Sequence, residues 1–256
     1  MINKECGITE AAAAATGLGE LVAKRIAPIS DWTDMGGSEH FVQFYESDEF
    51  IINSVAEYII HGLKTGETCI VVATGDHLAA LSSAMGSFGS EFGRANADGR
   101  YIALDAVEIL SRIVAEGRLD TTSFSNVLHP IIAEVASRGT QVRVFGEMVG
   151  LLCARGDYDQ ALKLENLWND LRQTYRFSLF CAYPISSLDN ARGEEMAHIC
   201  GHHTRVIPGE SYTALTSAND RLRKIACLQQ KGRQLEAEIA ELERRISARP
   251  SREAVH

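Results

Sequence analysis

Apolar runs and amphipathic segments alternate through the central part of the chain. Five runs have the composition of buried strands, and they lie at 40–45, 68–74, 101–106, 141–148 and 178–184. Segments with apolar residues at helical spacing separate these runs, and they lie at 50–59, 76–85, 107–115, 124–137 and 158–175. This alternation predicts an α/β fold with a mainly parallel, doubly wound sheet and helices on both faces.

The flanking segments divide the chain further. We expect an α/β domain over 39–186, preceded by a mobile N-terminal arm at 1–38 that shows no sustained hydrophobic period. Residues 187–216 are predicted to be a connecting segment of short helices and loops. The last segment, 217–250, is predicted to be an amphipathic helix.

That C-terminal helix carries a narrow apolar seam in steps of three and four residues. The seam consists of Ile225, Leu228, Gly232, Leu235, Ile239, Leu242 and Ile246, and charged residues fill most of the other positions. Such spacing is typical of a coiled coil. We therefore predict a homodimer through 225–246 or contact with a helix of a partner protein; a helix packed on its own domain is the alternative.

Composition and charge narrow the classes of partner. The chain has 25 Lys and Arg against 34 Asp and Glu, a net charge of −9, which disfavours direct binding to the phosphates of a nucleic acid. No apolar stretch approaches the roughly 20 residues of a membrane-spanning helix, and the N-terminus lacks the apolar core of a signal peptide. We therefore expect no membrane partner and a cytoplasmic protein.

The cysteines give no sign of a disulfide framework or a metal knuckle. They lie far apart, without a C-x-x-C pair, at Cys6, Cys69, Cys153, Cys181, Cys200 and Cys227. This pattern favours buried free thiols in a reducing compartment. Cys153 and Cys181 lie in apolar runs and are expected to be structural thiols rather than nucleophiles.

Familiar nucleotide-binding and hydrolytic motifs are missing. A phosphate-binding loop requires glycine amides, a lysine and a hydroxyl between the first strand and its helix, but the junction at 44–50 is FYESDEF. The stretch 62–68 contains Gly, Lys and Thr, yet it follows a helix and predicts a helix C-cap and turn. There is also no G-x-G-x-x-G after a strand, no G-x-S-x-G and no H-E-x-x-H, so we predict no enzyme.

One short segment concentrates potential metal ligands, namely His198, Cys200, His202 and His203. Their nitrogen and sulfur donors would suit zinc or haem iron, but four groups within six residues lack the paired spacing of a structural zinc site. The favoured prediction is that these four residues bind no metal and that their segment is a surface loop that docks the tail.

Two acidic positions are more promising. Glu147 follows the fourth strand run, where nucleotide-binding α/β proteins often place a catalytic carboxylate; a helix cap is the alternative. Glu165 shares one helical face with Trp168 and Asn169. For this face the alternative is a packed tryptophan with solvated neighbours.

Several segments together resemble the MEDS family, a sensory domain named from methanogens and methylotrophs. They are 40–68, the strand IVVAT with Asp76 and His77 after it, 143–152, and 161–184. The resemblance implies a fold related to the RecA and KaiC ATPases without the phosphate-binding loop, and a role in sensing small molecules. It also implies ligand-binding positions, which are His40, Tyr45, Ser47, Asp48, His77, Glu147, Glu165, Trp168 and Asn169.

The favoured prediction is therefore a non-catalytic cytoplasmic sensor or signalling adaptor. It would bind a small molecule at the carboxyl ends of the strands, where ligands of open α/β sheets bind, and signal through the C-terminal helix. Two alternatives remain: a divergent nucleotide hydrolase with Glu147 as its base, and a structural oligomerisation protein without a ligand. The sequence identifies no cofactor.

Overall fold

A computed structural model describes residues 37–189, 191 and 193–247. The predicted N-terminal arm falls almost entirely outside the described residues, as do the last positions of the predicted C-terminal helix. Of the described residues, those up to Thr213 belong to one compact unit and those from Ala214 belong to another, so each unit is described by itself.

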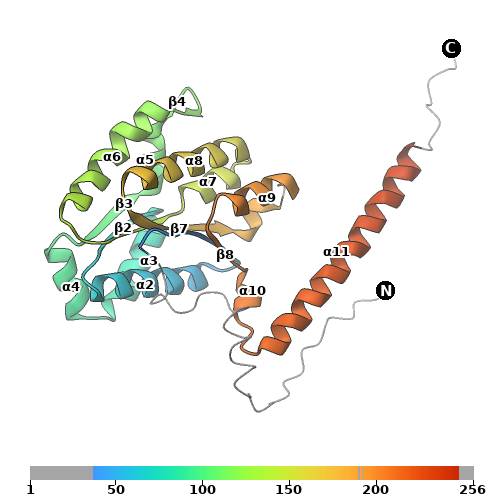
Figure 1. The fold of residues 1–256 in the computed structure, drawn as a ribbon, viewed down its shortest axis with the longest axis horizontal. Coiled ribbons are helices and arrows are strands. Elements are labelled where there is room, and N and C mark those ends of the chain that lie inside the picture. The colour runs from blue at the N-terminus through green and yellow to red at the C-terminus, as the bar shows by residue number, and fades with distance from the viewer. Residues whose placement is uncertain (1–36, 190, 192, 248–256) are drawn as a thin grey trace. The chain divides into compact units, whose positions relative to one another are not determined.

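A six-stranded parallel sheet forms the centre of the larger unit (Figure 1). Its strands follow the order β3-β2-β6-β7-β1-β8. Their bounds are β1 (His40–Tyr45), β2 (Thr68–Ala73), β3 (Tyr101–Asp105), β6 (Val142–Gly146), β7 (Phe177–Pro184) and β8 (Arg205–Ile207). The five predicted strands are confirmed, and the segment expected to be a connector supplies β8 at the sheet edge.

Helices cover both faces of the sheet, as predicted (Figure 1). One face carries α2 (Asp48–Lys64), α3 (Gly75–Gly86) and α4 (Ser90–Ala97). The other carries α5 (Ala106–Ile113), α6 (Thr121–Ser137), α7 (Met148–Ala154), α8 (Tyr158–Thr174) and α9 (Gly193–Gly201). Successive residues of β1 enter opposite cores, Phe41 on the α2 side and Val42 on the α8 side. The central strands β1, β2, β6 and β7 are therefore mostly apolar, because both of their faces are buried, whereas β3 is only partly buried.

Local turn chemistry explains where the helices begin and end. Ser47 caps α2, because its Oγ accepts from the amide of Phe50. The stretch 62–68 is the predicted C-cap and turn, in which Gly66 has a φ of 84°.

Three short elements depart from the prediction. The helix expected at 107–115 ends at Ile113, and the chain then forms the small antiparallel hairpin of β4 (Val114–Ala115) and β5 (Arg118–Leu119). Neither α4 nor α7 is predicted. In α7 the apolar residues surround the helix instead of following one face, since most of the helix is buried. A Cβ at Gly150 would lie 3.0 Å from the carbonyl oxygen of Ala182, so a larger residue there would crowd the backbone of β7.

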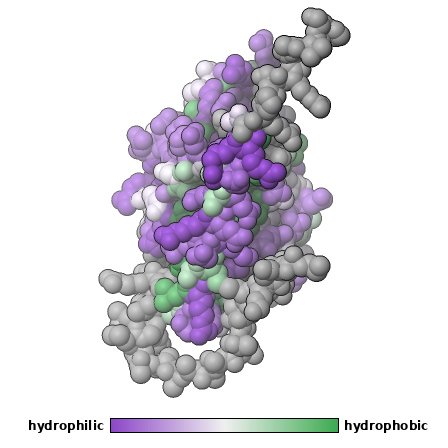
Figure 2. All heavy atoms as spheres, turned by 90° about the vertical axis from the view of Figure 1, so that its right-hand side faces the viewer, coloured by the Kyte–Doolittle hydropathy of each residue, from purple (hydrophilic) through white to green (hydrophobic). Residues whose placement is uncertain are grey.

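The C-terminal elements are the 3-10 helix η2 (Ile185–Leu188), α10 (Glu210–Thr213) and α11 (Ala218–Ser247). The predicted start of the last helix is confirmed. Most side chains of its apolar seam are exposed in the described structure, from 53% for Leu228 to 71% for Ile246. Hydrophilic residues cover most of the face shown in Figure 2, with smaller apolar patches between them. Among the described helices, none combines the length and apolarity needed to cross a bilayer.

The cysteines agree with the prediction in part. Cys69, Cys153, Cys181 and Cys200 are free, and all but the half-exposed Cys200 are buried. For Cys227 the expectation of a free thiol is wrong, because this residue is disulfide-bonded. Cys6 lies outside the described residues.

Candidate functional site

The carboxyl ends of the strands bring four side chains together, which we call the edge cluster: Tyr45, Asp48, His77 and Glu147. Tyr45 ends β1, Asp48 begins α2, His77 lies in the first turn of α3, and Glu147 follows β6. Nδ1 of His77 lies 2.6 Å from Oε2 of Glu147, and its Nε2 lies 3.4 Å from Oδ1 of Asp48. The amide of Thr74 donates to the other oxygen of Glu147. The sheet therefore fixes the carboxylate of Glu147 between a backbone amide and an imidazole.

The electrostatics of this cluster favour a charged pair and a neutral phenol. The hydrogen bond to Glu147 raises the pKa of His77, against the effect of burial, and the charges of Glu147 and Asp48 raise it further. Burial raises the pKa of Tyr45, and the same two carboxylates add to the shift. His77 thus holds its proton more tightly than an exposed histidine does.

The turn between β1 and α2 binds an internal carboxylate. Glu210 accepts hydrogen bonds from the amides of Ser47, at 2.9 Å, and Glu46, at 3.2 Å, and from the hydroxyl of Ser47 at 3.0 Å. Amides at a helix N-terminus bind anions, and in a phosphate-binding loop they would face the nucleotide. Here a side chain of the protein takes that place.

A hollow of about 270 Å³ opens at the same edge of the sheet, beyond the end of β7. It is lined by Cys153, Ala154, Gly156, Tyr158, Pro184, Ser186 and Ser187. None of the predicted ligand-binding residues lines it. Helix α7 runs between the two features, since Glu147 precedes its first turn and Cys153 lies in its last.

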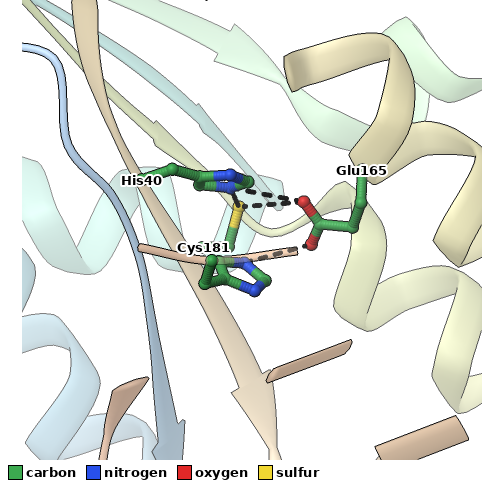
Figure 3. A group of neighbouring side chains, drawn as sticks. His40, Glu165 and Cys181 are labelled. Atoms are coloured by element: carbon green, nitrogen blue, oxygen red, sulfur yellow. Dashed lines mark hydrogen bonds and ion pairs between the residues drawn. The ribbon is translucent and has the colours of Figure 1, made fainter. Parts of the chain in front are cut away.

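A second group, which we call the buried cluster, consists of His40, Glu165, Cys181 and His203. Figure 3 shows the side chains of His40, Glu165 and Cys181 pointing toward one another from β1, α8 and β7. Nε2 of His40 lies 3.3 Å from Oε2 of Glu165 and 3.3 Å from the Cys181 sulfur. Nε2 of His203 lies 3.4 Å from Oε1 of Glu165. The side chains of both histidines and of Glu165 are fully buried.

Neighbouring groups hold these side chains in place. Nδ1 of His40 lies 2.9 Å from Oδ1 of Asn169, and Nδ1 of His203 lies 2.6 Å from the carbonyl oxygen of Ile199. The hydroxyl of Tyr183 donates to Oε1 of Glu165 at 2.5 Å. The buried cluster therefore has its own shell of hydrogen bonds.

Burial and neighbouring charges shift the pKa values of Glu165, His40 and Cys181. Burial opposes ionisation of Glu165, but His203 and His40 outweigh it and bring the pKa of Glu165 below its usual value. Burial lowers the pKa of His40, and it raises the pKa of the Cys181 thiol well above its usual value. A carboxylate therefore faces a neutral imidazole and a thiol in the protein interior.

Comparison with known families accounts for most of the larger unit. Residues 39–204 match the family described as the MEthanogen/methylotroph, DcmR Sensory domain, or MEDS. The chain belongs to the MEDS family. No curated protein matches it. The match reaches past α9 to the residue before β8, so the MEDS region also contains His203.

The site residues implied by the MEDS resemblance lie in three different places in the structure. Tyr45, Asp48, His77 and Glu147 form the edge cluster, with Ser47 beside it. His40, Glu165 and Asn169 lie instead at the buried cluster, and His40 is the first residue of β1, at the opposite end of that strand. Trp168 is 1% exposed and belongs to the hydrophobic core on the α8 side.

The group of metal-capable residues noted in the MEDS sequence at 198–203 does not come together. His198 is exposed and Cys200 half-exposed, and only His203 points into the buried cluster. Cys181, Tyr183 and Glu210 are not among the site residues predicted from the sequence. Alternation along β7 places Cys181 and Tyr183 on one face, but the sequence gives no register between β7, β1 and α8.

Proposed function

We propose that this chain is a non-catalytic sensor or signalling adaptor that binds a small molecule at the edge cluster. The observation that carries the proposal is the pairing of His77 with Glu147 at the carboxyl edge of the sheet, within a family described as sensory. We also propose a cytoplasmic location, which the free thiols of Cys69, Cys153, Cys181 and Cys200 support, although Cys227 is disulfide-bonded.

The chemistry of the edge cluster favours a small ligand that carries hydrogen-bond donors. Asp48 and Glu147 offer carboxylate oxygens, and Tyr45 offers a hydroxyl that can donate or accept. His77 neutralises part of the negative charge, since it retains its proton more tightly than usual. A neutral or cationic polar molecule fits this set better than an anion does.

The turn before α2 supports a non-catalytic protein over a nucleotide hydrolase. Glu210 occupies the amides of Glu46 and Ser47, and its negative charge would repel a phosphate at that position. We further propose that the fold is related to RecA and KaiC with the phosphate-binding loop lost. The parallel sheet and the FYESDEF junction support this relationship.

The output of the sensor is proposed to pass through α11. Its apolar seam of 225–246 is suited to a homodimer or to the helix of a partner protein, and the alternating charges around it suit a coiled coil. Glu210 in α10 binds the turn beside the edge cluster, and α11 follows α10 along the chain. A ligand that binds one arrangement of α10 more tightly than another would shift the equilibrium between these arrangements. The size of this shift is limited by the difference between the two affinities.

Native mass spectrometry of the purified protein tests the ligand. We expect a discrete extra mass on the unaltered chain and its loss in the variant with Tyr45→Phe and Glu147→Gln. The control Glu49→Gln, which changes an exposed residue in the first turn of α2, should retain the extra mass. An unaltered chain without extra mass would favour an adaptor or a ligand-free structural protein. Magnesium-dependent ATP turnover that Glu147→Gln abolishes would support the hydrolase instead.

The oligomeric mass tests the tail. We expect the unaltered chain to be a dimer and Leu235→Glu to be a monomer, because the substitution places a charge on the apolar seam. Ala237→Glu is the matched control, since position 237 lies outside the seam on the same helix. Light scattering after size-exclusion chromatography measures the mass. Equal oligomeric masses for both variants would show that the seam is not the dimer interface.

A further inference from the structure

The buried cluster has a donor set that the sensor hypothesis does not use. It brings together two imidazole nitrogens, a carboxylate oxygen and a sulfur, and all of these atoms lie within 4.8 Å of one another. Two nitrogens with sulfur and oxygen suit zinc among the common biological cations, whereas calcium and magnesium prefer oxygen alone.

The distances between donor atoms approach those of a tetrahedron around one ion. Zinc lies about 2.0–2.1 Å from histidine nitrogen and about 2.3 Å from sulfur, so tetrahedral ligand atoms are about 3.3–3.8 Å apart. In the buried cluster, the distances between His40, Glu165 and Cys181 donor atoms are 3.3, 3.3 and 3.9 Å. The distance from Nε2 of His203 to Glu165 is 3.4 Å. The His203 distance is to Oε1 of Glu165, whereas the His40 and Cys181 distances are to Oε2, and one ligand atom from each residue lies within 4.8 Å of the others, so the side chains must close slightly around an ion.

The hydrogen bonds around the cluster orient the potential ligand atoms toward its centre. Nδ1 of His40 faces the oxygen of Asn169, and Nδ1 of His203 faces a backbone carbonyl, so each ring donates its proton there. This tautomer leaves the lone pair of each Nε2 directed at Glu165. Histidines bound to zinc are usually oriented by such second hydrogen bonds, and Tyr183 orients Glu165 in the same way.

One donor atom is left without a hydrogen bond. Nε2 of His203 has no hydrogen-bond partner among the described residues, although the side chain is fully buried. Buried polar atoms without a partner are rare, because they lose their contact with water and gain nothing in return. A cation between Nε2 and the Glu165 carboxylate would satisfy both, and with a Cys181 thiolate it would leave the site without net charge.

We propose that a single zinc ion binds in the buried cluster, held by His40, Glu165, Cys181 and His203. The four protein ligands close the coordination sphere, so the site is structural rather than catalytic. The ion connects β1, α8 and β7 to the segment between α9 and β8. That segment is already attached to β1, because Thr204 and His40 exchange hydrogen bonds. Zinc thus fastens the last strand of the sheet, the one nearest the tail in sequence.

Metal analysis of the full-length protein with two matched pairs of variants tests this site. The unaltered chain is expected to contain about one zinc, and His203→Ala and Cys181→Ser are expected to retain about tenfold less. His198→Ala and Cys200→Ser replace the same residue types nearby, outside the cluster, and should retain the full amount. Equal zinc in all four variants, or another metal in its place, would overturn the assignment.

A second measurement uses the unaltered chain, so it does not depend on the folding of a variant. Treatment with a chelator should lower the melting temperature, and zinc alone should restore it. Cobalt in place of zinc should give intense visible bands of tetrahedral coordination and a thiolate charge-transfer band, which Cys181→Ser abolishes and Cys200→Ser does not. No zinc in the purified protein and no change on adding it would overturn the proposal.

Discussion

Replacement of Trp168 by alanine is expected to lower the free energy of unfolding by about 4 kcal/mol. The indole is 1% exposed and contacts two aromatic rings edge to face, Phe124 at 5.6 Å and Phe177 at 6.3 Å. Its removal leaves a cavity between α6, α8 and the sheet, which the surrounding side chains cannot fill. Chemical denaturation followed by circular dichroism measures the loss.

Two comparisons make this result specific. Trp168→Phe should lose clearly less stability than Trp168→Ala, since a phenyl ring keeps part of the packing. Val107→Ala changes an apolar side chain that is 48% exposed, so its effect should stay within about 0.5 kcal/mol. If Trp168→Ala kept its stability and lost a bound small molecule, Trp168 would be a ligand contact, as the MEDS resemblance implied.

Glu67→Ala is expected to lower the free energy of unfolding by about 3 kcal/mol, because it leaves a buried guanidinium without its carboxylate. Nε and Nη2 of Arg143 donate to the two oxygens of Glu67 at 2.5 and 3.0 Å. The guanidinium also lies 4.9 Å from the ring centre of Tyr58. Arg143 passes so close to Gly62 that a Cβ there would lie 2.7 Å from its side chain. The side chain therefore has little room to turn toward water.

The matched control is Glu57→Ala, which removes an exposed carboxylate from the same part of the chain and should change stability by about 0.5 kcal/mol or less. Adding Arg143→Met to Glu67→Ala should recover much of the loss, since an apolar side chain needs no counter-charge. Denaturant unfolding of the unaltered chain, Glu67→Ala, Arg143→Met and the variant with both substitutions completes a double-mutant cycle. Equal losses for Glu67→Ala and Glu57→Ala would show that the ion pair contributes nothing.

Strong local signals made the main elements predictable. The runs that became β1, β2, β3, β6 and β7 are apolar on both faces, and Ser47 marks the start of α2 with a cap. Short elements carry weaker signals. The strand β8 has three residues, of which Ile207 alone is buried, so its sequence does not differ from that of a loop.

The edge cluster followed from the sequence because all strands of a parallel sheet end at one edge. Once β1, β2 and β6 are assigned, Tyr45, His77 and Glu147 are placed at the carboxyl edge of the sheet, and the strand order then decides how close together they lie. The buried cluster could not be found in this way. His40 begins its strand, Cys181 lies inside β7, and His203 follows α9.

The sequence by itself determined the α/β class, the parallel sheet, the absence of a phosphate-binding loop and the apolar seam of α11, because each depends on residues close together along the chain. Only the tertiary structure decided that His40 meets Glu165, Cys181 and His203, that Trp168 belongs to the core, and that Glu210 binds the turn before α2. These contacts join residues far apart in sequence, and they depend on strand order and register, which hydrophobic periodicity does not encode.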